Sequence, residues 1–328
     1  MPRFPAAVLA LLTATVFASA AAAADDVGHS PWGAADEIGR LNLMTDASRL
    51  AVLSRIGSGR PYDLSVEYHI GMPSWQAIGD PRYQFWLTHS PRGTAVDDPM
   101  RVGPQQNRRV SYTGDAVSMY THTGTHIDAL NHFGLDGRIW NGFAADEHLG
   151  DRGWTRAGAE TIPPIVARGV LIDVATSRGV DALPPGYRIT VEDLRQALAR
   201  QRVKLHGGDV VLIRTGRMGA IGDGARFMAE PPGLGMAAAR YLVEEKGALS
   251  IGADNLSLES FPSEVPGNWI PVHTYLLAQQ GVTILEVVNL DALARDRIYE
   301  FAFIGASLRL RGASAAPMRP LAFALRAP

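Results

Sequence analysis

Short runs rich in β-branched residues alternate with segments of helical periodicity, and this alternation is the strongest constraint on the fold. The runs that predict strands cover residues 169–175, 209–215, 248–253, 282–288 and 299–309. Three helices are predicted. The first covers residues 45–56, and the last covers residues 236–246 and is ended by Gly247. The middle helix begins at Thr190, where Thr190 and Asp193 resemble a capping box. Strands that alternate with helices indicate an α/β fold. In the last run the residues alternate between two sets, Phe301 and Phe303 belonging to one and Ala302 and Ile304 to the other. This pattern predicts an antiparallel strand with one buried face, so we expect a mixed sheet.

No basic or acidic stretch marks the chain for a nucleic acid. Its 328 residues include 31 Lys and Arg against 33 Asp and Glu, a formal net charge of -2, and these charges are scattered. We therefore expect a small-molecule partner and no nucleic acid. The sequence contains no cysteine. This excludes disulfides and thiolate metal sites, so any metal ion would be held by nitrogen and oxygen atoms.

The beginning of the chain has the pattern of a secretory signal peptide. Arg3 supplies a positive start, an apolar run covers residues 6–17, and small residues end at Ala24 before Asp25. An uncleaved membrane anchor is the alternative, but the run is short and rich in alanine. We expect a signal peptide over residues 1–24 and a single domain over residues 25–328, with no linker or repeat inside it. The product would be exported, periplasmic or secreted, with no membrane attachment after cleavage.

Three of the nine histidines lie within one stretch of eleven residues, together with an aspartate. On an ideal helix His122 and His126 share a face, but Asp128 points nearly the opposite way. On an extended chain His122, His126, Asp128 and His132 all have the same parity, so an extended or looped segment can present them to one cavity. For any single histidine, an ordinary surface or core position is the better interpretation. Four such residues of one parity favour a metal site.

These residue types suit a catalytic metal site. Imidazole and carboxylate groups bind Zn²⁺, Mn²⁺ or Fe²⁺, and three ligands, His122, His126 and Asp128, leave positions for water and substrate. A bound divalent ion lowers the pKa of water toward roughly 7 and polarises a carbonyl group. We expect His132 to carry a proton to the leaving group.

The stretch from His122 to Phe133 resembles the His-x-Gly-Thr-His-x-Asp-x-x-x-His-[Phe/Tyr] signature of the cyclase-like metal-dependent hydrolases. That family includes bacterial kynurenine formamidase and isatin hydrolase. Further blocks in family order lie at residues 63–65, 71–73, 208–216, 251–254 and 273–286, so the resemblance extends over most of the mature chain. It implies that His122, His126 and Asp128 form the first metal site and that His132 is the proton shuttle.

The resemblance also implies a fold, an assembly and a second metal site. The fold would be a swivelling β/β/α domain, a mixed sheet or distorted barrel flanked by helices, assembled as a homodimer or higher homo-oligomer. Some members hold a second metal through positions that match His273 and Glu286, so we expect one or two divalent ions, Zn or Mn. Glu286 lies in an apolar run, where a buried charge needs a partner, and pairing with an arginine such as Arg214 is the competing interpretation. For His273 the alternative is a supporting or substrate-contacting role.

Aromatic residues gather in a segment rich in glycine and proline. They are Trp75, Tyr83, Phe85, Trp86 and His89. We predict that Trp75, Phe85, Trp86 and His89 line the substrate pocket on a loop that covers the metal, and a loop that packs its own aromatic residues is the equal alternative. Asp254 and Asn255 follow a predicted strand, which is a usual place for site residues and equally for a turn or cap.

The combined hypothesis is an isatin hydrolase-like or arylformamidase-like enzyme. It would be a metal-dependent hydrolase that opens or cleaves an amide, lactam, lactone or N-formyl carbonyl. The segment at residues 32–45 resembles that of longer family members, which together with export argues against kynurenine formamidase itself. The alternative is an exported metal- or ligand-binding protein without turnover, against which His132 argues because a metal trap needs no further base. The sequence has no phosphate-binding glycine loop and no Gly-x-Ser-x-Gly motif.

Overall fold

The computed structural model describes residues 26–90, 93–94, 101 and 112–326. The predicted signal peptide lies outside the described residues. Within the part that is described, no helix is both long enough and apolar enough to cross a bilayer.

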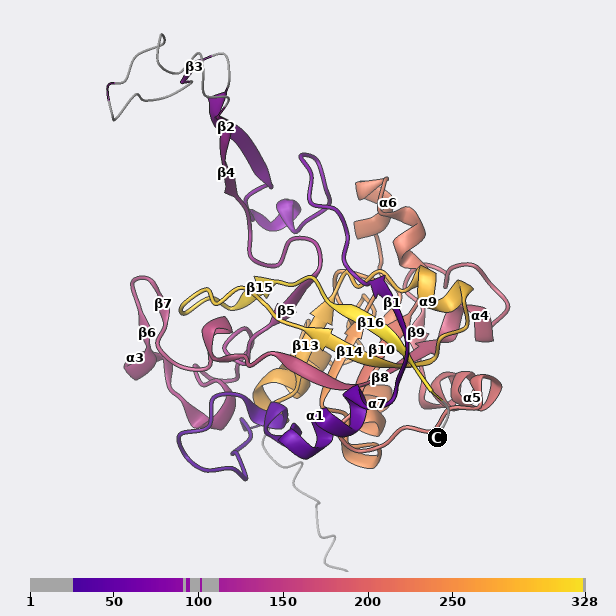
Figure 1. Cartoon of the computed structure of the whole chain (residues 1–328). Helices are drawn as coiled ribbons and strands as arrows, with labels where there is room; N and C mark the ends of the chain where they lie inside the picture. The colour runs from indigo at the N-terminus through magenta and orange to yellow at the C-terminus, as the bar shows by residue number, and fades with distance from the viewer. Residues whose placement is uncertain (1–25, 91–92, 95–100, 102–111, 327–328) are drawn as a thin grey trace, which may run out of the picture.

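A curled mixed sheet of nine strands forms the body of the molecule (Figure 1). In spatial order the strands are β1 (Ile56–Asp63), β16 (Leu321–Leu325), β14 (Glu300–Gly305), β8 (Ile165–Asp173), β10 (Val210–Arg214), β12 (Ser250–Ala253), β13 (Thr283–Glu286), β5 (His126–Asp128) and β15 (Ala315–Pro317). The four strands from β8 to β13 are parallel, and the strands on either side of them pair antiparallel. The predicted fold class, an α/β swivelling β/β/α domain with a mixed sheet or distorted barrel flanked by helices, is confirmed.

Both faces of the central strands are buried, which explains their continuous apolar runs. On one face Ile172 and Ile213 pack against helices. These are α5 (Val191–Gln201), α7 (Met236–Arg240) with its π-helical continuation η6 (Tyr241–Glu245), and α8 (Pro271–His273) with its continuation η7 (Thr274–Gln279). On the other face Leu171 and Leu212 pack with Phe301 and with Leu41 of η1 (Gly39–Leu43). The sheet is therefore the middle layer of the core.

Several local predictions hold, and others stop where packing overrides the pattern. The capping box of Thr190 and Asp193 opens α5 as expected. The first helix, α1 (Asp46–Leu53), is capped by Thr45 but ends before Ile56, which begins β1 instead. The strand predicted to start at Gly169 begins at Ile165 and ends at Asp173, where α4 (Val174–Ser177) follows.

The predicted strand at residues 299–309 is antiparallel, as expected, but it ends at Gly305. Its expected single buried face is wrong, because Phe301, Ala302 and Phe303 are all buried. Phe301 and Phe303 pack with Leu171 and Leu212 on one face of the sheet, and Ala302 is buried on the other face.

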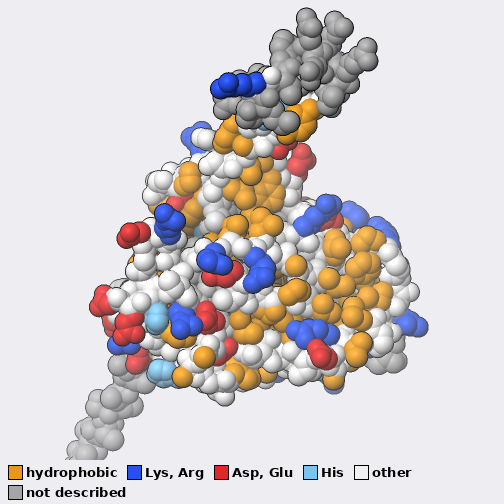
Figure 2. Space-filling view, turned by 60° about the vertical axis from the view of Figure 1, so that its left-hand side comes forward, with side chains coloured by type: hydrophobic (Ala, Val, Ile, Leu, Met, Phe, Trp, Pro, Cys, Tyr) orange, Lys and Arg blue, Asp and Glu red, His pale blue; other side chains and the backbone are white. Residues whose placement is uncertain are grey.

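A narrow arm extends from the body. Its strands are β2 (Gln84–Ser90), β3 (Gly93–Thr94) and β4 (Gly114–Ser118), which pair antiparallel in the order β3-β2-β4. Figures 1 and 2 show this arm projecting away from the nine-stranded sheet, with hydrophobic side chains along it.

The remaining elements are short. They are η2 (Gln76–Ile78), η3 (Trp140–Gly142), α3 (Ala145–His148), β6 (Leu149–Gly150), β7 (Gly153–Trp154), η4 (Ala159–Thr161), β9 (Arg188–Ile189), η5 (Arg217–Ala220), α6 (Gly224–Met228), β11 (Gly233–Leu234) and α9 (Asp291–Arg295).

Candidate metal centre

Two neighbouring strands bring an imidazole and two carboxylates together. His126 and Asp128 lie two residues apart on β5, and Glu286 of β13 is the cross-strand partner of His126. Residues two apart on a strand, and directly paired residues on adjacent strands, share one face of a sheet. All three side chains are buried, and one ligand atom from each lies within 4.8 Å of the others.

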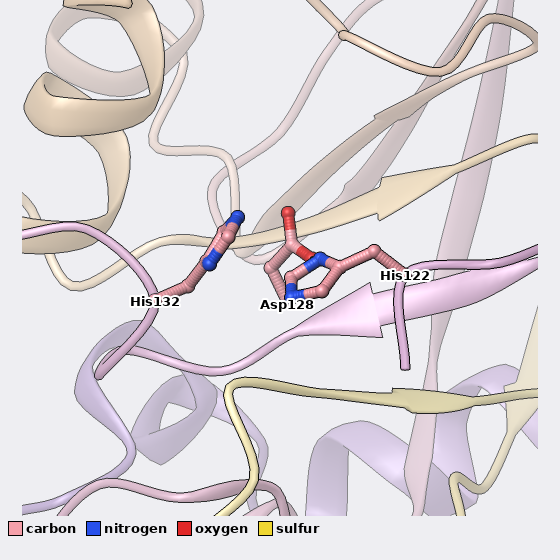
Figure 3. A group of neighbouring side chains, drawn as sticks. All are labelled: His122, Asp128 and His132. Carbon is pink, nitrogen blue, oxygen red and sulfur yellow. The ribbon is translucent and has the colours of Figure 1, made fainter. Parts of the chain in front are cut away.

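His122 and His132 reach the same place from turns on either side of β5. Figure 3 shows both rings directed toward the Asp128 carboxylate. His122 Nδ1 lies 2.8 Å from Asp128 Oδ1, and the His122 and His132 ring centroids are 3.9 Å apart. One ligand atom each from His122, Asp128 and His132 forms a second group within 4.8 Å. The predicted extended geometry thus applies to His126 and Asp128, whereas turns place the outer two histidines.

Gly124 allows the turn between His122 and His126. Its φ of +63° lies in the left-handed region, and a Cβ there would lie 2.8 Å from the Tyr68 ring. The Tyr68 hydroxyl donates a 2.5 Å hydrogen bond to the Thr125 carbonyl, and the Thr125 hydroxyl donates to Val287 O at 2.7 Å. A glycine is therefore required where the chain bends against Tyr68 to place the two histidines.

The hydrogen bonding of His126 leaves a set of acceptors facing one another. Its Nδ1 lies 2.8 Å from Gly124 O, and because a carbonyl can only accept, Nδ1 carries the proton. In the neutral ring Nε2 is then an acceptor, yet it lies 3.3 Å from Asp128 Oδ1 and 3.5 Å from Glu286 Oε2. His126 Nε2 and both Asp128 oxygens are buried without a hydrogen-bond partner. Burial lowers the pKa of His126, but Asp128 and Glu286 raise it overall. This donor set fits a divalent cation.

His273, the last residue of α8, extends the same set. Its Nε2 lies 3.3 Å from Glu286 Oε1 and 3.9 Å from Asp128 Oδ2. Its Nδ1 lies 2.8 Å from Glu259 Oε1, so this carboxylate holds the proton on Nδ1 and turns Nε2 toward Glu286. Burial lowers the pKa of His273, but the hydrogen bonds and charges of Glu259 and Glu286 outweigh it and raise the pKa to about 10.

The structure excludes one interpretation of the sequence and adds one residue to the site. Arg214 forms ion pairs with Asp173 at 3.2 Å and Asp291 at 2.8 Å, so it is not the partner of Glu286. The orienting carboxylate of Glu259 was not predicted. The signal available for it was a single charged residue in the stretch at residues 256–261, which otherwise holds only leucine, serine and phenylalanine.

His132 has the electrostatics of a neutral imidazole. Burial and the nearby His122 hold the pKa of His132 well below its ordinary value, against the attraction of Asp128. A neutral ring at the edge of the acceptor set can take up a proton and pass it on.

A cavity of about 770 Å³ opens above the centre. His122, His132, His273 and Glu286 contribute to its floor, and most of its remaining wall is apolar or aromatic. The wall residues are Trp75, Ile78, Tyr120, Phe133, Met228, Glu230, Pro231, Leu256, Ser257, Phe261, Pro262, Trp269 and Ile270. A cavity of this size, with a few polar groups converging at one end, is typical of a small-molecule site.

Only one of the predicted pocket aromatics lines this cavity. Trp75 does, with the ring of Phe261 6.4 Å from its own. Phe85, Trp86 and His89 belong to β2 and are not among the residues that line this cavity, so their assignment to the substrate pocket stays a prediction. The reason is that the chain leaves the body as an antiparallel arm after η2 instead of folding back over the centre.

Asp254 and Asn255 hold loops around the cavity. Asp254 accepts hydrogen bonds from Thr215 and Gly216, and Asn255 Nδ2 donates to Pro232 O at 2.5 Å. Asn255 Oδ1 also accepts from the Leu258 N–H at 2.9 Å, which is the turn interpretation, whereas Asp254 joins its segment to the distant loop at Thr215.

Comparison with known proteins adds a family assignment. The sequence profile of the Cyclase family, described as "Putative cyclase", matches residues 62–260. Cyclase-like protein 3 of Oryza sativa subsp. japonica is 26% identical over 276 residues, which cover 80% of this chain and 79% of that protein.

Solved structures share the fold. A crystal structure described as a novel cyclase matches with a TM-score of 0.76 and 28% identity, covering 89% of this chain and 97% of the other. Isatin hydrolase A from Ralstonia solanacearum matches with a TM-score of 0.61 and 23% identity, covering 80% and 91% of the two chains.

Proposed function

This chain belongs to the Cyclase family, and on that premise we propose that it is a metal-dependent hydrolase that opens or cleaves an amide, lactam, lactone or N-formyl carbonyl. One observation carries the proposal: buried acceptor atoms of His126, Asp128 and Glu286 face one another and make no hydrogen bond, and the ring nitrogen next to Asp128, His122 Nδ1 at 2.8 Å, belongs to a further candidate ligand. Acceptor atoms arranged in this way are stabilised by a cation.

The residues that would hold the ion fall into two groups that share Asp128. One group is His122, Asp128 and His132, and the other is His126, Asp128 and Glu286. The first site expected from the sequence, His122, His126 and Asp128, would draw on both groups, and His273, whose Nε2 lies 3.3 Å from Glu286 Oε1, would join Glu286 in a second site. We propose zinc or manganese, one or two ions per chain. When bound, the ion supplies an electrophile for the carbonyl oxygen and a more acidic water molecule.

The protein's own groups perform the rest of the reaction. The aromatic wall, with Trp75 and Phe133, excludes bulk water and stacks on a planar substrate. A ring nitrogen of neutral His132 accepts a proton from the attacking water and delivers it to the departing nitrogen or oxygen.

The test is hydrolysis of N-formylkynurenine, isatin, simple lactones and cyclic imides by metal-stripped protein reloaded with Zn²⁺ or Mn²⁺. We expect metal to restore turnover of at least one compound. His132→Ala should abolish turnover while metal still binds, Asp128→Asn should lose both, and His148→Ala, on α3, is the matched control. Metal binding without turnover of any compound would favour a binding protein instead.

We also propose that the chain forms a homodimer or higher homo-oligomer through the β2–β4 arm. Phe85 is 43% exposed, Trp86 45% and Val117 53%, on strands with no core of their own. A small isolated sheet is marginally stable in water. We infer that a second copy of this chain covers the arm, because one self-complementary contact between two arms buries the apolar side chains of both. Interfaces of obligate homodimers are apolar in this way. Figure 2 shows the hydrophobic side chains of the arm continuing toward the body.

Light scattering after size-exclusion chromatography tests the assembly. We expect the wild-type protein to be dimeric or larger and Trp86→Ser to move it toward a monomer. Leu50→Ser replaces a leucine on α1 that is 67% exposed, and it should leave the mass unchanged. A monomeric wild-type protein would contradict the proposal.

We further propose that the protein is exported and that its mature form begins near Asp25. Sequencing the amino terminus of protein from the periplasmic or culture fraction tests this, and an intact Met1 on protein from those fractions would contradict it.

A further inference from the structure

One acidic side chain on the cavity wall has no partner. Glu230 is exposed on the wall, and no hydrogen bond or ion pair of its carboxylate exists among the described residues. The other wall acid, Glu286, is turned toward His126 and His273 in the floor. No Lys or Arg is among the described lining residues. A single unpaired carboxylate therefore sets the charge of the outer part of the cavity.

The backbone at Glu230 is unusual. Its φ of +40° lies in the left-handed region, which residues other than glycine rarely adopt. Such a conformation persists only where the surrounding structure fixes it, and it is frequent at ligand-binding positions. The next two residues are Pro231 and Pro232, which add further stiffness.

Four successive carbonyls around Glu230 each accept a hydrogen bond. The pairs are Arg217 Nη2 to Ala229 O, Gly186 N–H to Glu230 O at 2.8 Å, Phe261 N–H to Pro231 O at 3.3 Å, and Asn255 Nδ2 to Pro232 O at 2.5 Å. Arg217 and Asn255 are buried, and Arg217 Nε also donates to Phe227 O at 2.9 Å. The protein thus commits two buried polar side chains to holding this segment in place.

The cavity that Glu230 lines has a largely apolar and aromatic wall. The wall includes Trp75 with Phe261 and Phe133 with Trp269, the rings of the second pair lying 5.8 Å apart edge to face. Aromatic faces combined with one carboxylate recognise organic ammonium groups by cation–π attraction and charge. An anionic group would meet like charge and no arginine or lysine from the described wall.

Resting on the proposed hydrolase function, we propose that Glu230 is a specificity-determining residue that selects aromatic amides carrying an ammonium group and rejects those carrying a carboxylate. The ammonium group lies against Glu230 and the aromatic wall, while the scissile carbonyl lies over the centre in the floor. The class of substrate is therefore a cationic N-acyl arene or lactam without an accompanying anionic group.

The experiment compares three matched formanilides, unsubstituted, with an aminomethyl group and with a carboxymethyl group, on the metal-loaded enzyme. We expect a KM about tenfold lower for the aminomethyl compound than for the unsubstituted one, as a charge-assisted hydrogen bond provides. Glu230→Gln should bring this ratio close to one, and Glu230→Lys should invert the preference toward the carboxymethyl compound. Glu67→Gln, on an exposed residue outside the cavity, should keep the wild-type ratio.

A binding measurement separates this inference from the hydrolase proposal. Benzylammonium binding can be followed through the change in tryptophan fluorescence, because Trp75 and Trp269 line the cavity, whether or not any formanilide is cleaved. If no compound is cleaved but binding weakens about tenfold in Glu230→Gln, the reaction class is wrong and the ammonium site stands. If Glu230→Gln leaves both the KM ratio and this binding unchanged, the inference is overturned.

Discussion

Removing the Glu259 carboxylate is expected to weaken metal binding without touching a metal ligand. Glu259 is 2% exposed and accepts three hydrogen bonds, from His273 Nδ1 at 2.8 Å, the His273 N–H at 2.9 Å and the Val272 N–H at 3.2 Å. Only the first of these orients the His273 ring toward Glu286. Loss of such an orienting group typically costs about 10- to 100-fold in metal affinity, which is about 1.4–2.7 kcal/mol.

Two substitutions separate charge from geometry. Glu259 Oε1 accepts both bonds from His273, and Oε2 accepts the bond from Val272. In Glu259→Gln the amide oxygen can keep the two His273 bonds, so the ring stays oriented and only the charge is lost. Glu259→Ala loses both. We therefore expect affinity to fall toward the upper end of the range in Glu259→Ala and toward the lower end in Glu259→Gln.

Chelator competition with Zn²⁺ and Mn²⁺ measures these affinities, with circular dichroism to verify the fold. In Glu259→Gln the Val272 N–H faces an amide NH₂ group, so unfolding free energy should also fall by about 1–3 kcal/mol. Glu37→Gln is the matched control, because Glu37 also accepts a backbone N–H, from Ala157 at 2.8 Å, and is not part of either candidate metal group. Wild-type affinity in a folded Glu259→Ala protein would refute the orienting role.

Three further predictions concern stability. Gly169→Ala should lower the unfolding free energy, measured in urea, by about 1–3 kcal/mol, because a Cβ there would lie 2.1 Å from the Phe301 ring. Adding Phe301→Leu should recover part of this loss. If Gly169→Ala is as stable as the wild type, the contact with Phe301 is looser than the structure shows. Burial raises the pKa of Asp193, but Thr190, Tyr187 and Arg178 outweigh it and lower the pKa overall. At a pH above the ordinary aspartate pKa, the unfolding free energy of the wild type should therefore be about 1 kcal/mol larger than that of Asp193→Asn. That difference should vanish as the pH falls through the lowered pKa, and a difference independent of pH would contradict the assignment. Metal at about 100 times its Kd should stabilise the wild-type protein by about 2.7 kcal/mol in thermal unfolding, and any similar gain in Asp128→Asn would place the ion elsewhere.

The site illustrates how far local pattern extends. The sequence identifies His122, His126, Asp128 and His132 as one group because they occupy eleven consecutive residues, and the structure brings them together. Shared parity, however, describes only His126 and Asp128 of β5, since Gly124 and the turn after Ala129 place the outer histidines.

Local chemistry determines what the sequence alone reveals: the capping box at Thr190, the alternating helices and strands, and the spacing of the metal-binding residue types all act over a few residues. The strand order is different, because β13 lies beside β5 although the chain between them is about 150 residues long, and only this pairing sets Glu286 opposite His126. The same is true of Glu259 against His273, of the four pinned carbonyls at Glu230, and of the β2 arm that carries Phe85 and Trp86 away from the cavity. Those contacts depend on how distant segments pack together, and periodicity in a sequence carries no information about such packing.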